Sequence, residues 1–214
     1  ITFINSLDTR NSEILEDIER EALADNVPII RREMQSFLKV LLMVKKPMRV
    51  LEVGTAVGFS ALLMSEYVPE ECAITTIENY EKRIPIARQN FVRAGKEKKI
   101  TLLEGDAMDV LKTLEGPYDF IFMDAAKGQY IHYLPEILRL LAKGGILVSD
   151  NVMQDGDVIE SRFAVERRDR TIHARMREYL YELKHNDALV TSIIPLGDGV
   201  ALSVKKEVGT DIAQ

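Results

Sequence analysis

Several oxygen-bearing side chains stand where β-rich segments of the sequence end. Asp106 lies in EGDA, Asp124 lies in FMDAAKGQY, and Asp150 and Asn151 are adjacent in ILVSDNV. In open α/β sheets, ligands bind beyond the carboxyl ends of the strands. Two carboxylates and one amide oxygen form a hard, all-oxygen set that suits Mg²⁺. We therefore interpret Asp124, Asp150 and Asn151 as candidate ligands of Mg²⁺ or another divalent cation.

Each of these residues also has an ordinary structural explanation. Asp124 could cap a following helix, and an Asp-Asn pair after a strand is a common turn former. Lys127 follows Asp124 by three residues, so the two side chains would share one side of a helix that starts there. A solvated lysine is the plainer interpretation of Lys127. Spacing alone leaves both interpretations open.

A glycine-containing segment, MRVLEVGTAVGFSALLM, places Glu52, Gly54 and Gly58 where a buried strand should turn into a helix. Gly54 permits a sharp turn and puts no side chain between the backbone and a ligand. Thr55 and Ser60 add hydrogen-bonding groups beside the free N–H groups of the helix start. The spacing is not that of the G-x-G-x-x-G dinucleotide fingerprint, which weakens a nicotinamide interpretation.

Glu78 ends the next β-rich segment, TTIE. A carboxylate at that position can accept hydrogen bonds from both hydroxyls of a ribose. The alternative is a tight turn followed by a surface glutamate. Together, the glycine segment and Glu78 favour a nucleotide-like cofactor.

The surrounding pattern predicts the elements that would position these groups. Apolar residues at helical spacing predict helices over about 12–23, 31–44 and 158–184. The predicted strands are 48–53, 73–78, 99–104, 118–124, 145–149, 190–196 and 200–205. Alternation of strands and helices predicts an α/β fold with a mostly parallel seven-stranded sheet, helices on both faces and a C-terminal antiparallel hairpin.

Composition narrows the class of protein. Residues 1–214 contain no Gly/Ser/Pro-rich linker, so we expect a single domain with N-terminal helices over 1–46, a core over 47–206 and a tail over 207–214. The net charge of -6 argues against coating nucleic acid by overall charge. The only cysteine, Cys72, excludes an internal disulfide. No apolar run approaches the roughly 20 residues of a membrane span, and we expect a cytoplasmic protein without a membrane partner.

Taken together, these motifs resemble the cation-dependent O-methyltransferases, the family of catechol and caffeoyl-CoA O-methyltransferases. The resemblance lies in LEVGTAVGFS, the strand-end Glu78, DAAK and SDN. Within this family the sequence looks closest to the bacterial tRNA 5-hydroxyuridine methyltransferases, through DAAKGQY, DNV, the Arg-rich region and IIPLGDGVALSVKK. The resemblance implies a Rossmann-like class I methyltransferase fold, S-adenosylmethionine as cofactor and a homodimer.

The resemblance also implies roles for individual residues. The segment 52–60 would hold the methionine part of S-adenosylmethionine, Glu78 its ribose, and Asp106 with Ala107 the adenine side. Asp124, Asp150 and Asn151 match the metal ligands, and Lys127 matches the general base. Ile30 matches a backbone contact to the cofactor. The expected cofactor residues are Ile30, Glu52, Gly54, Thr55, Gly58, Ser60, Glu78, Asp106, Ala107 and Asp124.

An Arg-rich stretch bears on the methyl acceptor. Residues 162–177 contain six arginines against Glu166 and Asp169 only. Such a local surplus can bind phosphates, although a solvated face laced with ion pairs explains it as well. The resemblance favours 5-hydroxyuridine in tRNA as acceptor, giving 5-methoxyuridine. A small catechol-like phenol and a non-catalytic cofactor-binding module are the alternatives. The candidate tRNA contacts are Arg162, Arg167, Arg168 and Arg170.

Overall fold

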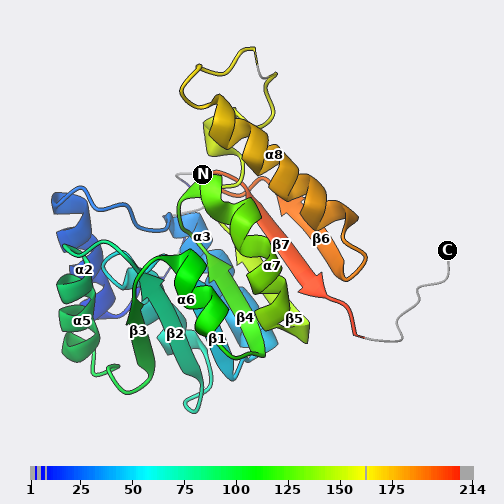
Figure 1. The fold of residues 1–214 in the computed structure, drawn as a ribbon. Coiled ribbons are helices and arrows are strands. Elements are labelled where there is room, and N and C mark those ends of the chain that lie inside the picture. Colours follow the sequence, from blue (N-terminus) through cyan, green and yellow to red (C-terminus); the bar gives the residue numbers. More distant parts are fainter. Residues whose placement is uncertain (1–2, 4–5, 8, 162, 208–214) are drawn as a thin grey trace. The chain divides into compact units, whose positions relative to one another are not determined.

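The computed structural model describes residues 3, 6–7, 9–161 and 163–207 (Figure 1). The chain groups into two compact units, Ile1–Ala107 and Met108–Gln214. The division of the chain into a single domain with an N-terminal part, a core and a tail stays a prediction, and residues 208–214 of the expected tail lie outside the described residues.

The first unit alternates helices and parallel strands. Its strands are β1 (Arg49–Val53), β2 (Ala73–Glu78) and β3 (Ile100–Glu104), in the order β3-β2-β1. Its helices are α2 (Glu13–Ala24), α3 (Arg32–Lys45), α4 (Phe59–Tyr67) and α5 (Ile84–Arg93). Because Val53 pairs with Ile77, the ends of β1 and β2 lie side by side.

The two predicted N-terminal helices are confirmed. In α2, Leu15, Ile18 and Ala22 form one buried stripe. In α3, Leu38 and Leu42 do the same. Apolar residues three or four positions apart face one side of a helix, and burial of that side accounts for both elements.

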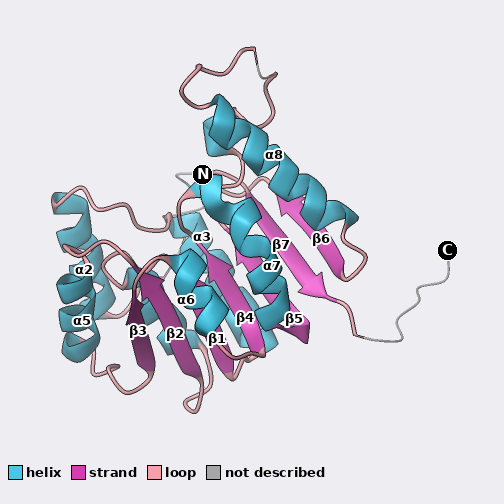
Figure 2. Cartoon of the chain, viewed as in Figure 1, coloured by secondary structure: helices cyan, strands magenta, loops and turns pink. Residues whose placement is uncertain are grey.

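The second unit begins within helix α6 (Ala107–Thr113) and ends in a hairpin (Figure 2). Its strands β4 (Tyr118–Met123) and β5 (Leu141–Ser149) are parallel, whereas β7 (Val200–Lys205) pairs antiparallel with both β5 and β6 (Leu189–Ile194). Between them lie a 3₁₀ turn (Lys127–Gln129), α7 (Tyr130–Leu140), a second 3₁₀ turn (Gln154–Gly156) and α8 (Arg170–His185). The described residues thus contain seven strands, mostly parallel and ending in an antiparallel hairpin, which confirms the predicted α/β class.

The helix predicted over 158–184 is wrong in its first part, because α8 begins only at Arg170. The described residues before it form turns. An α-helix there would need a continuous apolar stripe, but Phe163 is 88% exposed while Val158 is buried. The Val158 carbonyl accepts a hydrogen bond from the Arg177 side chain of α8.

The turn between β6 and β7 supports the segment that follows β5. The Gly199 carbonyl accepts the N–H of Val152, and the Asp198 carbonyl accepts the N–H of Met153. Gly199 has φ +80, a region that L-residues rarely adopt. A Cβ atom at Gly199 would also collide with Cγ and Cβ of Met153.

We expect Gly199→Ala to lower the free energy of unfolding by about 2–4 kcal/mol, because left-handed strain adds to overpacking. The matched control is Gly95→Ala, where φ is +64 and nothing lies within 4 Å of the added Cβ. That control should cost only about 1 kcal/mol. Urea unfolding of both variants measures the difference, and equal losses would show that the contact with Met153 has no cost.

Candidate active site

The carboxylate of Glu52 organises the loop that follows β1. Glu52 is fully buried, and its two oxygens accept hydrogen bonds from Ser60 Oγ and Thr76 Oγ1. The Thr55 hydroxyl bonds to that of Thr76. A buried carboxylate is tolerated when its oxygens are hydrogen-bonded. Three predicted cofactor residues, Glu52, Thr55 and Ser60, therefore lie together, and they are joined by Thr76, which sequence reasoning missed because a strand threonine carries no motif signal.

The loop itself needs glycine at its end. Gly58 precedes α4 with φ +85, and a Cβ there would lie 2.5 Å from Cε1 of Phe91. The N–H groups of Gly54 and Thr55 both donate to the Ile77 carbonyl at 3.1 Å. The loop after β1 is thus tied to β2 by backbone hydrogen bonds.

Glu78, at the end of β2, faces the same loop. Its Oε2 accepts the N–H of Ala56 at 2.7 Å, and its Oε1 accepts the N–H groups of Asn79 and Tyr80 at 3.0 and 2.8 Å. The predicted ribose-binding carboxylate and the predicted methionine-binding loop are therefore in direct contact. The neighbouring β3 end joins this group, because Gly105 N–H donates to the Glu78 carbonyl.

The remaining predicted cofactor residues of the first unit differ in exposure. Asp106 is exposed in the turn before α6, and Ala107, the first residue of that helix, is buried. Ile30 is buried before α3, and its carbonyl accepts Nε2 of Gln35 at 3.1 Å. A ligand that uses the Ile30 carbonyl would share it with Gln35.

In the second unit, the four predicted catalytic and metal-binding residues form one cluster. Asp124 directly follows β4, and Asp150 directly follows β5. Lys127 Nζ lies 2.8 Å from Oδ1 of Asn151 and 3.5 Å from Oδ1 of Asp124. The ammonium group thus lies near oxygens from both strand ends. Lys127 reaches Asp124 from a 3₁₀ turn rather than from the α-helix that its spacing indicated.

Asn151 adopts a conformation suited to its type. Its φ is +54, in the left-handed region where asparagine is enriched. Its N–H donates to Oδ1 of Asp150 at 2.7 Å. The turn after β5 therefore fixes the backbone that carries two of the three predicted ligands.

Asp150 carries an unfavourable charge. Asp150 is only 5% exposed. Burial, followed by the nearby Asp124 carboxylate, raises the pKa of Asp150 to about 6. The N–H of Asn151 and the Lys127 ammonium oppose this rise. The partly exposed Asp124 carboxylate thus disfavours the charge of the buried Asp150, and a bound cation would offset this effect.

The donor set fits a hard divalent cation. Asp124, Asp150 and Asn151 supply two carboxylates and an amide oxygen, as Mg²⁺ prefers. No cluster of three or more His, Cys, Asp or Glu side chains suited to a metal occurs in the described parts of the chain. A site built from this set would therefore depend on the amide of Asn151 and on water as well as on the two carboxylates.

The arginines divide into two groups. Arg167 and Arg168 are exposed, and Arg168 pairs with Glu166 and Asp169 at 3.0 and 3.3 Å. Arg170 donates to the backbone carbonyl of Val165. Arg162 lies outside the described residues.

The arginines of α8 act on backbone carbonyls. Arg175 donates to the Gly128 carbonyl at 3.1 Å, next to Lys127. Arg177 donates to the carbonyls of Val158 and Glu160. Part of the arginine surplus therefore supports the fold.

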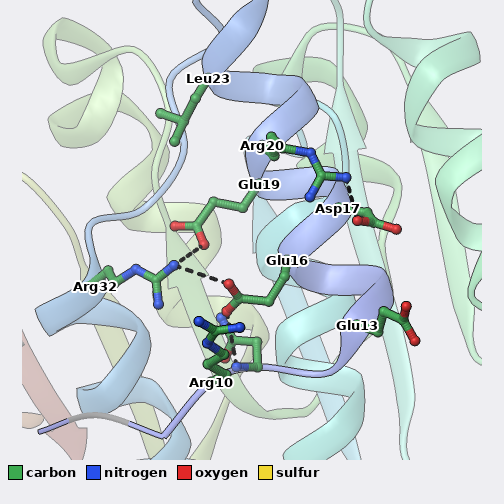
Figure 3. A pocket seen from close by; sticks show the side chains of 9 residues that line it. Arg10, Glu13, Glu16, Asp17, Glu19, Arg20, Leu23 and Arg32 are labelled. Carbon is green, nitrogen blue, oxygen red and sulfur yellow. Dashed lines mark hydrogen bonds and ion pairs between the residues drawn. The ribbon is translucent and has the colours of Figure 1, made fainter. Parts of the chain in front are cut away.

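A pocket of about 750 Å³ that is lined mainly by charged residues lies on the first unit (Figure 3). None of the predicted site residues is among its nine lining residues. In Figure 3, Arg32 points between Glu16 and Glu19, and Arg20 pairs with Asp17. Its charged groups thus largely neutralise one another. The nine lining residues are Arg10, Asn11, Glu13, Glu16, Asp17, Glu19, Arg20, Leu23 and Arg32.

Within the described residues, none of the helices is both long and apolar enough to cross a membrane. The expected cytoplasmic location stays a prediction.

Strand-end carboxylates and a glycine loop after β1 are typical of α/β enzymes that bind nucleotide-like cofactors. The family model for O-methyltransferases matches residues 5–206. Catechol O-methyltransferase of Niastella koreensis is 35% identical over 128 residues, which are 58% of this chain and 58% of that protein. Caffeoyl-CoA O-methyltransferase 2 of Populus trichocarpa is 33% identical over 183 residues, covering 78% of this chain and 70% of that protein. The crystal structure of SAH-bound Podospora anserina methyltransferase PaMTH1 has a TM-score of 0.87 at 27% identity, covering 96% of this chain and 93% of that one.

The chain belongs to the O-methyltransferase family. This confirms the predicted enzyme class, the fold class and the resemblance to catechol and caffeoyl-CoA O-methyltransferases. The closer likeness to tRNA 5-hydroxyuridine methyltransferases stays a prediction, as do the individual site residues.

The raised pKa of Asp150 gives a test of the buried charge. Because the folded value of about 6 exceeds the unfolded value of about 3.9, ionisation of Asp150 costs folding free energy. The cost grows as pH rises from about 4 to about 6 and is complete above that. Asp150→Asn should therefore raise the free energy of unfolding of the metal-free protein by about 1–3 kcal/mol at about pH 8.

The gain should be smaller by about 1 kcal/mol at about pH 5, where part of the cost is already absent. Urea unfolding in excess chelator at both pH values measures it. The exposed Asp187→Asn is the control and should change little at either pH. A gain from Asp150→Asn that is the same at both pH values would contradict the raised pKa.

Proposed function

We propose that this protein transfers a methyl group from S-adenosylmethionine to a hydroxyl oxygen, with Mg²⁺ or another divalent cation bound at Asp124, Asp150 and Asn151. The observation that carries the proposal is the cluster in which Lys127 Nζ lies within 2.8 Å of Asn151 Oδ1 and 3.5 Å of Asp124 Oδ1. Membership of the O-methyltransferase family supports it.

The cofactor proposal rests on the loop after β1 and on Glu78. Glu52 holds Thr76 and Ser60 in place, and Gly58 gives the loop its left-handed turn. Glu78 accepts two hydrogen bonds at Oε1 and one at Oε2, so Oε2 keeps acceptor capacity for a ribose hydroxyl. The similarity to an SAH-bound methyltransferase supports S-adenosylmethionine as the ligand of these residues.

The chemistry is an in-line displacement, in which the bond between methyl carbon and sulfur breaks while the bond between methyl carbon and acceptor oxygen forms. Alignment of the reacting atoms is the enzyme's main contribution. When bound, a divalent cation stabilises the deprotonated form of the acceptor hydroxyl. We assign to Lys127 the role of general base for that proton, since its nitrogen lies beside two of the three ligands.

We propose 5-hydroxyuridine in tRNA as the acceptor. The supporting observation is that Arg167 and Arg168 are exposed in the segment leading into α8, and that α8 packs on the turn that carries Lys127. Exposed arginines beside a site can bind the phosphates of a nucleic acid. The carbonyl next to the hydroxyl of 5-hydroxyuridine could complete a chelate.

A small catechol-like phenol is the second candidate acceptor. Its support is the identity of 35% and 33% to a catechol and a caffeoyl-CoA O-methyltransferase. The second hydroxyl of a catechol would take the place of the uridine carbonyl. A cofactor-binding module without turnover is the third candidate function.

A homodimer also stays a proposal. The exposed apolar residues Val40, Met43 and Val44 of α3 offer a surface for it.

Asp124→Ala should lower turnover at least about 100-fold, because the cation loses one of its ligands. The bound cation would stabilise the charge on the acceptor oxygen by several kcal/mol. Turnover is measured with methyl-labelled S-adenosylmethionine, Mg²⁺ and either catechol or tRNA from a strain without this protein, followed by nucleoside identification. Cofactor affinity, measured by calorimetry, should persist at least weakly. Full turnover in excess chelator would contradict the proposed metal dependence. Labelled catechol with unlabelled tRNA would favour the second candidate, and no labelling of either would favour the third.

Reversal of both exposed arginines, Arg167→Glu with Arg168→Glu, should weaken tRNA binding and make the logarithmic salt dependence of affinity shallower by about 2, one for each lost phosphate contact. Filter binding over a range of salt concentrations measures this. The control is Lys98→Glu with Lys112→Glu, which changes net charge equally at two exposed positions. An equal effect of both pairs, or none, would remove the arginine surface from the proposal; affinity for the cofactor should stay unchanged throughout.

A further inference from the structure

The hydroxyl of Tyr130 lies between the two strand ends that carry the predicted metal ligands. Tyr130 is the first residue of α7 and is fully buried. Its oxygen lies 3.1 Å from the Met123 carbonyl and 3.2 Å from the Asp150 carbonyl, and it accepts the N–H of Ala125 at 3.2 Å. One hydroxyl thus contacts the backbone on both sides of Asp124 and the backbone of Asp150 itself.

These contacts continue the pairing of β4 and β5 beyond its last regular step. The register ends with Met123 opposite Ser149, and the N–H of Asp150 donates to the Met123 carbonyl at 2.9 Å. Beyond Met123 and Ser149, no regular strand pairing fixes the distance between the segments that follow β4 and β5. The Tyr130 hydroxyl, with one proton for two carbonyls and a lone pair for Ala125 N–H, supplies a further link there.

The ring of Tyr130 is held firmly enough to fix its hydroxyl. It packs edge-on against Tyr179, with centroids 5.4 Å apart and planes at 75°. The Tyr179 hydroxyl is bonded to Oγ of Ser149 at 2.6 Å, and its ring is fully buried as well. Burial, followed by the Asp124 carboxylate, raises the pKa of Tyr130 well above its ordinary value, so the hydroxyl stays a neutral donor.

We propose that Tyr130 is a positioning residue whose hydroxyl sets the spacing of Asp124 and Asp150 and thereby the affinity of the site for a divalent cation. It acts through the backbone and touches neither the cation nor the acceptor. This inference rests on the proposed function, because it needs a cation at Asp124, Asp150 and Asn151.

The decisive variant is Tyr130→Phe, and Tyr179→Phe is its matched control. Each removes one hydroxyl from a fully buried ring, but only the Tyr130 hydroxyl bonds to the backbone around the ligands. Mn²⁺ affinity is measured by electron paramagnetic resonance of the free ion, without cofactor or acceptor. We expect Tyr130→Phe to bind Mn²⁺ about 10- to 100-fold more weakly, as for other groups that orient metal ligands, and Tyr179→Phe to stay within about 3-fold of the wild type.

A second measurement uses the wild-type protein and so does not depend on the folding of a variant. If the hydroxyl favours cation binding, the cation must favour the hydroxyl's bonds to the same degree. Saturating Mg²⁺ should therefore slow hydrogen exchange of the Ala125 amide, which donates to Tyr130.

The outcomes separate the two levels of the proposal. Unchanged Mn²⁺ affinity in Tyr130→Phe, equal losses in both tyrosine variants, or an Ala125 amide indifferent to bound Mg²⁺ would overturn the role of Tyr130 while leaving the metal site intact. Equal Mn²⁺ affinity in the wild type and in Asp124→Ala would overturn the proposed metal site, and with it the role of Tyr130.

Discussion

The second unit is organised around the repulsion between two carboxylates that its topology brings together. Asp124 and Asp150 follow adjacent parallel strands, so they end at the same edge, and Asp150 is almost fully buried there. Like charges in such a place are unfavourable unless a cation or hydrogen-bond donors offset them. Lys127 and the N–H of Asn151 supply part of that compensation, and the raised pKa of Asp150 shows that it is incomplete. A divalent cation is the ligand that such an arrangement favours.

The first unit handles its buried carboxylate in a different way. Both oxygens of Glu52 are occupied by the hydroxyls of Ser60 and Thr76, so this charge is satisfied within the protein and stiffens the loop after β1. Glu78 instead accepts backbone N–H groups, including that of Ala56 in the loop. Glu52 therefore has a structural function in shaping the loop, whereas Glu78, Asp124 and Asp150 are the carboxylates that we propose bind ligands.

Two arginines of the Arg-rich stretch stabilise the fold. Arg175 and Arg177 of α8 bond to carbonyls of Gly128 and Val158, and so connect the helix to the turn of Lys127 and to the irregular segment before α8. Because these side chains bind backbone carbonyls, we do not include them among the candidate phosphate-binding groups. Arg167 and Arg168 remain exposed, which confines the proposed tRNA surface to a short stretch.

The sequence by itself determined the elements whose patterns are local. Apolar residues at helical spacing predicted α2 and α3, and short β-rich runs predicted the seven strands, with Glu78, Asp124 and Asp150 at or just beyond the ends of three of those runs. Only the tertiary structure decided the rest. Arg177 of α8 donates to the carbonyl of Val158 in the irregular segment before the helix, and the Tyr130 hydroxyl reaches the carbonyl of Asp150, 20 positions away. Such contacts join segments distant in the chain, and no local pattern of residue types encodes the distance between them.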